Sequence, residues 1–285
     1  MDRLIYQNDR VIEVGEARVD PQSAGLLYGW GVFTTLRVYN GAAFAVDRHL
    51  ERLLRHAEKA RIDTAITPDA ARRALNDLIA ANAVEHGRAR LTLFKGDAGA
   101  WRVDAAGETE FLIFTSSEPA RAPRELTLTI SPIRLHSSSP LAGVKQTSLI
   151  EHVLALEEAR ARQFSEAVLL NERGEIVSAT AGNIFWVEGD GIYTPSLATG
   201  CIAGITRGFI YDAARKMGLH LVEGGFPVQR LLDAAEVFIT STTREVAPVV
   251  SFDIKEYNQK QARLTRLLAR EFQKFVRNAK ITKKS

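Results

Sequence analysis

The sequence has little of the chemistry that stabilises small secreted or metal-binding proteins. Cys201 is its single cysteine, so neither an intrachain disulfide nor a zinc site made of several cysteines can form. The six histidines show no metal-ligand spacing. No stretch is apolar enough to span a membrane, and the first residues lack the apolar run of a signal peptide. We therefore expect a cytoplasmic protein without a bound metal.

An excess of charge of one sign is also missing. The 37 basic and 34 acidic residues give a formal net charge of +3, and only the tail from Lys280 to Lys284 forms a basic cluster. Such a balance argues against a nucleic-acid or membrane partner. With 285 residues, 46% of them hydrophobic, the chain is long enough for one large core or two modest ones.

The order of the expected strands and helices indicates an α+β protein. Strands are predicted at residues 4–6, 11–14, 32–39, 44–46, 89–94, 110–115, 125–133, 167–170, 183–187, 192–194 and 237–239, and helices at 48–61, 68–85, 149–162, 204–217 and 258–278. They mix without a strict βαβ alternation, which argues against a doubly wound sheet. A linker at residues 116–124, with Pro119 and Pro123, divides the chain into domains of residues 1–118 and 119–285.

Lys145 is the residue around which the candidate site is built. It follows the small, apolar segment Leu141-Ala142-Gly143-Val144. Desolvation in such surroundings lowers the pKa of a lysine, because it disfavours the charged form. A neutral amine can attack an aldehyde and hold a cofactor as a Schiff base. A lysine after a glycine is by itself usually a surface charge, so the interpretation depends on other segments.

Three further features are typical of a phosphate site. Gly204-Ile205-Thr206 begins a predicted helix, whose first N–H groups lack partners within the helix and attract anions. Ser241-Thr242-Thr243 offers hydroxyl and N–H groups after a buried strand, and Arg52 is a candidate bidentate phosphate ligand. Each feature alone also fits an ordinary cap, turn or solvated arginine. Motifs for a nucleophile elbow, a Rossmann fold or a P-loop are missing.

Together these segments resemble the fold-type IV pyridoxal-phosphate enzymes, which include branched-chain aminotransferases, D-amino-acid aminotransferases and 4-amino-4-deoxychorismate lyases. The resemblance covers nearly the whole chain. It is carried by Tyr28 to Tyr39, His49-Leu50-Glu51-Arg52, Leu141 to Lys145, Ala181 to Trp186, Gly204 to Arg207 and Thr240 to Thr243.

The resemblance implies a two-domain fold like that of D-amino-acid aminotransferase. The larger C-terminal domain would carry the cofactor lysine, the active site would lie between the domains, and the chain would form a homodimer with pyridoxal 5′-phosphate (PLP) as cofactor. Lys145 matches the lysine that forms the Schiff base and moves the substrate proton. The other matching positions would bind the cofactor phosphate (Arg52, Thr206, Ser241, Thr242 and the N–H of Ile205) and line the substrate side (Phe33, Thr35 and Arg37), with Arg37 or Arg102 holding a substrate carboxylate.

One position departs from the family pattern. Family members usually carry a glutamate that contacts the pyridine nitrogen of PLP, and the alignment on Asn183-Ile184-Phe185 places Ser178 there. A serine can hydrogen-bond to that nitrogen but cannot hold a positive charge on it as a carboxylate does. Glu175, three positions away on an extended segment, would point to the opposite face. The departure disfavours efficient transamination, which needs a strong electron sink.

Three functions follow as hypotheses. The first is a 4-amino-4-deoxychorismate lyase, which releases pyruvate and the 4-aminobenzoate used for folate synthesis and in which aromatisation of the product drives the reaction. Ser131-Pro132, Arg134-Leu135 and Trp186 resemble that branch. The second is a branched-chain or D-amino-acid aminotransferase that uses 2-oxoglutarate. The third is a degenerate, non-catalytic family member, which only Ser178 supports and which Lys145 counts against.

Overall fold

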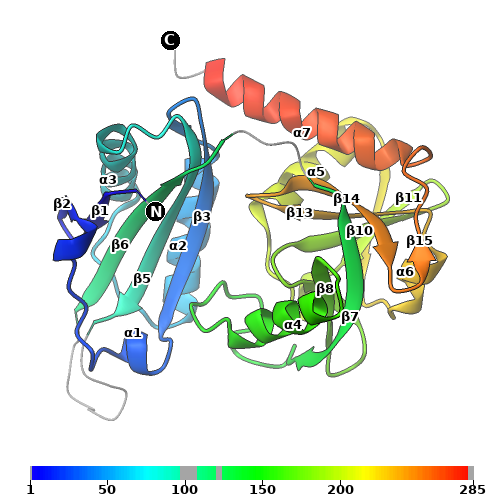
Figure 1. Cartoon of the computed structure of the whole chain (residues 1–285), viewed down its shortest axis with the longest axis horizontal. Helices are drawn as coiled ribbons and strands as arrows, with labels where there is room; N and C mark the ends of the chain where they lie inside the picture. The colour runs from blue at the N-terminus through cyan, green and yellow to red at the C-terminus, as the bar shows by residue number, and fades with distance from the viewer. Residues whose placement is uncertain (1, 97–107, 120–123, 282–285) are drawn as a thin grey trace. The chain divides into compact units, whose positions relative to one another are not determined.

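The computed structural model describes residues 2–96, 108–119 and 124–281. It divides into two compact units (Figure 1). The first contains Met1–Arg121 and Val144–Ser148, and the second contains Ala122–Gly143 and Leu149–Ser285. The predicted domain boundary at residue 118 lies close to this division. Lys145, which we expected in the second domain, is grouped with the first unit, because its peptide group hydrogen-bonds to residues of that unit.

The first unit is a six-stranded sheet covered by helices. The strand order is β2-β1-β6-β5-β3-β4, and all pairs are antiparallel. The elements are β1 (Leu4–Gln7), β2 (Arg10–Glu13), the 3-10 helix η1 (Val14–Glu16), α1 (Ala24–Leu27), β3 (Gly31–Tyr39), β4 (Ala42–Ala43), α2 (Val46–Lys59), α3 (Pro68–Ala81), β5 (His86–Lys95) and β6 (Thr109–Ser117).

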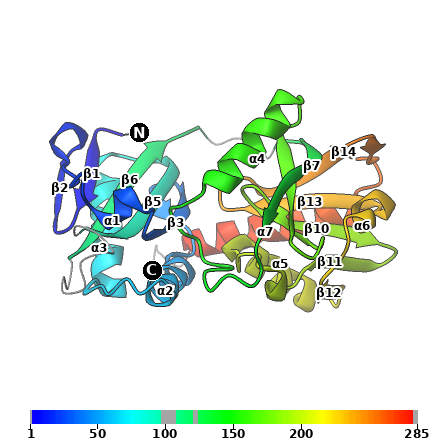
Figure 2. The same cartoon turned by 90° about the horizontal axis from the view of Figure 1, so that it is seen from below.

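The two faces of this sheet have different roles. Alternation along β3 directs Val32, Leu36 and Val38 toward α2 and α3, which lie on one side of the sheet (Figure 2). The opposite face carries Phe33, Thr35 and Arg37, as the sequence predicts. In the antiparallel register Thr92, Arg90 and Arg88 of β5 lie directly beside those three residues. This second face is therefore unusually rich in arginine for a sheet.

The second unit is built on a nine-stranded mixed sheet. Its order is β12-β11-β10-β13-β14-β7-β8-β9, with β15 paired to β14, and the β11–β12, β14–β7 and β7–β8 pairs are parallel. The elements are β7 (Leu126–Leu135), α4 (Ile150–Ala161), β8 (Glu166–Asn171), β9 (Ile176–Ala179), β10 (Asn183–Glu188), β11 (Gly191–Pro195), η2 (Leu197–Thr199), α5 (Ile205–Lys216), β12 (His220–Gly224), α6 (Gln229–Asp233), β13 (Glu236–Ser241), β14 (Glu245–Phe252), β15 (Lys255–Glu256) and α7 (Arg263–Ile281).

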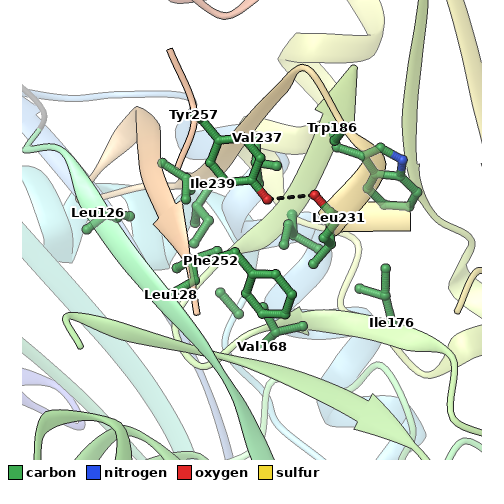
Figure 3. Packing of buried hydrophobic residues seen from close by; sticks show 14 of the residues in the cluster. Leu126, Leu128, Val168, Ile176, Trp186, Leu231, Val237, Ile239, Phe252 and Tyr257 are labelled. Carbon is green, nitrogen blue, oxygen red and sulfur yellow. Dashed lines mark hydrogen bonds between the residues drawn. The ribbon is translucent and has the colours of Figure 1, made fainter. Parts of the chain in front are cut away.

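A contiguous apolar core supports this second sheet. Trp186, Ile239, Phe252 and Leu128 are almost completely buried and pack together, and the Tyr257 hydroxyl donates to the Leu231 carbonyl over 2.7 Å (Figure 3). Within this unit α4 and α5 lie on opposite sides of the sheet (Figure 2). Side-chain packing in this core thus fixes the strands that carry the candidate phosphate residues. Of the helices described, none has the length and apolar character needed to cross a membrane.

The structure corrects several expected element boundaries. The first long helix begins at Val46 rather than at residue 48. Its N-cap is Ala45 in the left-handed conformation (φ 54°), and Asp47 lies in the first turn, paired with Arg72. The last helix begins at Arg263 rather than at residue 258. The Glu236 carboxylate there accepts hydrogen bonds from the N–H groups of Leu264 and Thr265. The α+β class is confirmed.

Candidate functional site

The segment with Lys145 is fastened to the start of β3. The Lys145 N–H donates to Nδ1 of His56 (3.0 Å), and its carbonyl accepts from the Phe33 N–H (3.0 Å). Gln146 forms a bridge with Val32, and the Thr147 N–H donates to the Gly31 carbonyl. The backbone from which the lysine side chain extends is therefore held on both sides by hydrogen bonds.

Gly143 allows the chain to turn into this segment. Its φ is +74°, a value that residues with a side chain rarely adopt, and a Cβ there would lie 3.2 Å from the Cys201 carbonyl oxygen. Val144 follows and is buried. The small residues that mark this stretch in the sequence thus have a conformational cause as well as an apolar character.

The Lys145 amine lies in surroundings that favour its neutral form. Its Nζ is 4.4 Å from the centroid of the Phe33 ring. Burial first, and then the positive charges of Arg52 and Arg90, lower the pKa of Lys145 from 10.5 to about 7. The sequence predicted this direction, and the amine is consequently available as a nucleophile or base near neutral pH.

Arg52 belongs to a buried polar network on α2. Its Nη2 donates to the Thr34 hydroxyl (2.9 Å), which also hydrogen-bonds to Nδ1 of His49 (2.7 Å). Burial and the nearby charge of Arg55 lower the pKa of Arg52 to about 10. A guanidinium held in a fixed position and buried in this way has a large desolvation cost, which an anionic ligand would offset.

On the arginine-bearing face of the sheet, Arg90 and Arg37 have different partners. Arg37 forms an ion pair with Glu118 (3.2 Å), which also pairs with Arg88 (3.0 Å). Arg90 is half-buried, its guanidinium stacks 3.6 Å from the centroid of the Phe33 ring, and burial lowers its pKa. Its Nε donates to the Thr92 hydroxyl over 3.3 Å. Arg102, the other predicted carboxylate ligand, lies outside the described residues.

In the second unit, α5 presents its amino-terminal N–H groups without a side-chain cap. Gly204 is the N-cap, and Ile205 and the buried Thr206 are the first two helical residues. The Asn183 amide donates to the Ile202 carbonyl (2.8 Å), and a Cβ on Gly204 would lie only 2.1 Å from the Asn183 Oδ1. Only glycine therefore allows the helix start to approach β10 this closely.

The turn between β13 and β14 is anchored by a buried carboxylate. The Ser241 hydroxyl accepts from the Arg244 N–H (3.1 Å), and the Arg244 guanidinium pairs with Glu166. Glu166 is completely buried and also accepts from the Thr180 N–H (2.9 Å). The predicted phosphate residues Ser241 and Thr242 are thus carried by a turn that is tied to β8 and to the residue after β9.

The two candidate phosphate elements converge on Asn183 within this unit. Asn183 is paired with Thr240 across β10 and β13, while its side chain contacts the start of α5. The Thr240 hydroxyl is buried and makes no hydrogen bond to any described residue. An unsatisfied buried hydroxyl and uncapped helix N–H groups are both groups that a bound anion can satisfy.

Ser178 lies in β9, half-buried, and pairs with Leu169 of β8. The nearest acid on its amino-terminal side, Glu175, is already engaged, because it accepts from the Asn171 amide (2.7 Å) and pairs with Arg173 (2.6 Å). Arg173 and Asn171 lower the pKa of Glu175. Glu175 is therefore an ionised structural residue of the β8–β9 turn.

These donor groups suit a phosphorylated aldehyde. In the first unit, Lys145 has the lowered pKa that Schiff-base formation needs, and Arg52 is a buried cation; in the second unit, Thr206 and the N–H groups of α5 are potential donors to an anion. Within residues 2–96, 108–119 and 124–281, no group of three or more histidine, cysteine or acidic side chains could hold a metal ion.

Sequence patterns alone did not single out His56, Arg90, Asn183 or Glu166. His56 and Glu166 act through contacts between residues far apart in the chain, 89 and 78 positions respectively. Arg90 had a detectable signal, since alternation along the predicted strand at 89–94 separates it from the apolar Leu91 and Leu93. Asn183 entered the sequence analysis only as an alignment point.

Known proteins are similar to this chain over nearly its whole length. The family model for amino-transferase class IV matches residues 31–252. The chain is 29% identical over 279 residues to the aminodeoxychorismate lyase of Bacillus subtilis, covering 96% of this chain and 95% of that protein. It is 30% identical over 272 residues to a putative branched-chain-amino-acid aminotransferase of Methanocaldococcus jannaschii (94% of each), and 30% identical over 247 residues to the D-alanine aminotransferase of Bacillus licheniformis (86% and 87%).

A solved structure has the same fold. The branched-chain aminotransferase of Thermoproteus uzoniensis, crystallised with norvaline, superimposes with a TM-score of 0.90 at 26% identity, covering 96% of this chain and 94% of that one. Since the family model spans most of the chain and the relatives align over nearly their full lengths, the chain belongs to the class IV aminotransferase family and is a PLP-dependent enzyme.

Proposed function

We propose that the enzyme is a 4-amino-4-deoxychorismate lyase, which converts its substrate to pyruvate and 4-aminobenzoate. The observation that carries this proposal is the combination of a buried lysine of lowered pKa with a serine, Ser178, at the position of the usual acid. Glu175 cannot replace that acid while it is held by Arg173 and Asn171. The similarity to the B. subtilis lyase over 96% of the chain supports the same choice.

The lyase reaction tolerates a weaker electron sink than transamination does. When bound, PLP supplies an aldehyde that activates the carbon bearing the substrate amine. Lys145, about half of which is neutral at pH 7, removes the proton from that carbon. The bond between the ring and the enolpyruvyl oxygen then breaks, the ring becomes aromatic, and the released enolpyruvate takes up a proton to give pyruvate. Aromatisation supplies much of the driving force.

The proposed cofactor ligands follow the family resemblance. We propose Lys145 and Arg52 in the first unit, and Ile205, Thr206, Ser241 and Thr242 in the second, as residues that bind PLP, with Ser178 as the residue facing the pyridine nitrogen. The charge of Arg52 and the α5 N–H groups both suit the phosphate dianion. On the substrate side we propose Phe33, Thr35 and Arg37.

Arg90 is the group that we propose for the substrate carboxylate. It is half-buried beside Phe33, close enough to Lys145 to lower the lysine pKa, whereas Arg37 is paired with Glu118. Arg90→Gln is expected to raise KM by about a hundredfold, the loss of a charge-assisted hydrogen bond of roughly 2–3 kcal/mol. Arg88→Gln is the matched control, with a change in KM below about threefold. An equal effect of both substitutions would exclude Arg90 as the specific ligand.

One assay separates the proposed reaction from the alternatives. The PLP-loaded enzyme is given 4-amino-4-deoxychorismate, and pyruvate and 4-aminobenzoate are measured together. Equimolar release of both products, abolished by Lys145→Ala, supports the lyase. In parallel, L-leucine, D-alanine and L-glutamate are added without a keto acid, and conversion of the cofactor to pyridoxamine phosphate is followed by absorbance. Conversion by an amino acid without turnover of aminodeoxychorismate would reject the lyase.

An aminotransferase is the second candidate. Arg90 is equally suited to the side-chain carboxylate of glutamate or 2-oxoglutarate, and the M. jannaschii and B. licheniformis relatives are named as aminotransferases. The amino acid that converts the cofactor would then identify the substrate class. A non-catalytic role is disfavoured because Lys145 has the lowered pKa that its chemistry requires.

A further inference from the structure

The peptide group of Lys145, and not only its side chain, has a dedicated partner. Of the hydrogen bonds that hold residues 145–147, one uses a side chain from a different element: the Lys145 N–H donates to Nδ1 of His56 on α2, at 3.0 Å. His56 is buried, with only 6% of its surface exposed. The other bonds of this segment, to Gly29, Gly31 and Phe33, fix it to the start of β3.

This contact requires one protonation state of His56. A nitrogen that accepts a hydrogen bond carries no proton, so the ring must be the neutral tautomer with its proton on Nε2. Burial first, and then the positive charges of Arg52, Arg55 and Lys59 on α2 and of Lys145 opposite, lower the pKa of His56 to about 4. The ring consequently remains an acceptor throughout the neutral range.

His56 also lies one helical turn after Arg52. Residues four positions apart share one face of a helix, so α2 presents the guanidinium of Arg52 and the imidazole of His56 on the same side. Both side chains are buried. A single rigid helix thereby sets the positions of a proposed phosphate ligand and of the lysine backbone.

We infer that His56 is a positioning residue, which fixes the Lys145 peptide through its unprotonated Nδ1 and so keeps the lysine in register with Arg52. The inference rests on the proposed role of Lys145 as the cofactor lysine. In this role His56 does not contact the reacting atoms. His56 acts through the backbone of Lys145. This effect depends on the hydrogen-bond acceptor of the imidazole and not on the volume of the ring.

The test uses hydrogen exchange of the Lys145 amide in the apoprotein, followed by NMR. His56→Leu keeps an apolar group of similar bulk but has no acceptor, and it is expected to accelerate Lys145 exchange roughly tenfold, the loss of one buried hydrogen bond. His56→Asn places an oxygen near the position of Nδ1 and is expected to restore protection. The Thr147 amide, bonded to Gly31, is the internal reference and should change by less than about twofold.

Asn82→Leu is the matched control. The Asn82 side chain also accepts from a backbone N–H, that of Leu4 on β1, at 3.1 Å. In the sheet β1 is separated from β3 by β6 and β5, a distance of roughly 14 Å at the usual strand spacing. This variant should lose stability without changing Lys145 exchange. Unchanged exchange in His56→Leu, or equal acceleration in His56→Leu and His56→Asn, would overturn the inference.

A second readout follows the cofactor. After borohydride reduction, peptide mass spectrometry measures how much PLP is attached to Lys145 at each PLP concentration. His56→Leu is expected to raise the apparent Kd about tenfold and His56→Asn to restore it. If the wild type attaches no PLP at Lys145, the proposed function fails, while the exchange experiment still decides the role of His56.

If His56→Leu does not fold, the inference is tested on the wild-type protein through the protonation state of His56 Nδ1. In the long-range ¹H–¹⁵N correlation spectrum of the ¹⁵N-histidine-labelled protein, Nδ1 of His56 should show the shift of an unprotonated nitrogen from pH 8 down to about pH 5, since its pKa is about 4. A protonated Nδ1 at neutral pH would exclude the acceptor role.

Discussion

At the residue scale, the most consequential property is the lowered pKa of Lys145. At a pKa of about 7, half of this amine is neutral at pH 7, whereas an ordinary lysine with a pKa near 10.5 is almost completely protonated. We expect the rate at which the apoprotein attaches PLP to Lys145 to rise with pH and to level off just above pH 7. Borohydride trapping and mass spectrometry at several pH values measure this rate.

The effect of the Arg90 charge on Lys145 can be tested with the same pH profile of PLP attachment. Since Arg90 lowers the pKa of Lys145, Arg90→Gln should move the midpoint of the pH profile upward. Arg88→Gln serves as the control, because Arg88 is half-exposed and paired with Glu118. A profile that continues to rise to pH 10 in the wild type would contradict the assigned environment of Lys145.

Burial of His56 makes the apoprotein sensitive to acid. Its folded-state pKa of about 4 lies below the ordinary 6.5, so its contribution to stability is fully present above pH 6.5 and is lost as the pH falls toward 4. The shift corresponds to at most about 3 kcal/mol. Urea unfolding at pH 7, 5.5 and 4.5 should show a decline that His56→Asn makes shallower. His49, whose pKa burial also lowers, contributes in the same direction.

At the element scale, the start of α5 depends on the absence of one side chain. Gly204→Ala would place a methyl group 2.1 Å from the Asn183 Oδ1 and force the helix start away from β10. We expect a cost of about 1–3 kcal/mol in stability from overpacking. PLP affinity should fall by tenfold or more if α5 binds the phosphate.

The control for this prediction is Gly15→Ala. A Cβ at Gly15 meets no atom within 4 Å, so its effect on thermal stability and on PLP binding should be small. Binding is followed by fluorescence quenching, and stability by thermal unfolding of the apoprotein. Unchanged PLP affinity in a destabilised Gly204→Ala protein would argue against α5 as the phosphate site.

Most elements were predictable from local patterns, and the failures have identifiable causes. The strand at Gly31–Tyr39 and the helix at Pro68–Ala81 follow from alternation and from Thr67 followed by Pro68 at the helix start. β9 and β14 were missed because their short apolar runs gain their strand conformation from neighbours in the nine-stranded sheet. The start of α7 depends on Glu236, which is distant in the chain.

The candidate site was predictable where it depends on chain-local chemistry. Lys145 follows small residues, and Thr206 and Ser241 lie at a helix start and a strand end, so their sequence context identifies them. Arg90, His56 and Glu166 acquire their surroundings only when distant strands and helices meet. Sequence spacing carries no record of such contacts, and for this reason they required the structure.

At the scale of the whole molecule, the proposed PLP ligands are spread along the chain from Arg52 to Thr242. Arg52→Gln in the first unit and Thr206→Val in the second should each raise the Kd for PLP by about tenfold, because each removes a hydrogen bond to the phosphate. Equilibrium dialysis with free PLP measures both. Arg55→Gln, on the exposed side of α2, is the control. If either substitution leaves the Kd unchanged, the substituted residue is not a phosphate ligand.

The return of the chain to the first unit at Val144–Ser148 has a consequence for biosynthesis. The first 121 residues leave the ribosome before the segment that completes the edge of β3. A nascent first unit therefore lacks both Lys145 and the peptide partner of His56 until Ser148 has emerged from the ribosome, after residues 122–143 of the second unit. The first unit consequently gains its cofactor lysine late in translation. A fragment that ends at the interdomain linker lacks this lysine.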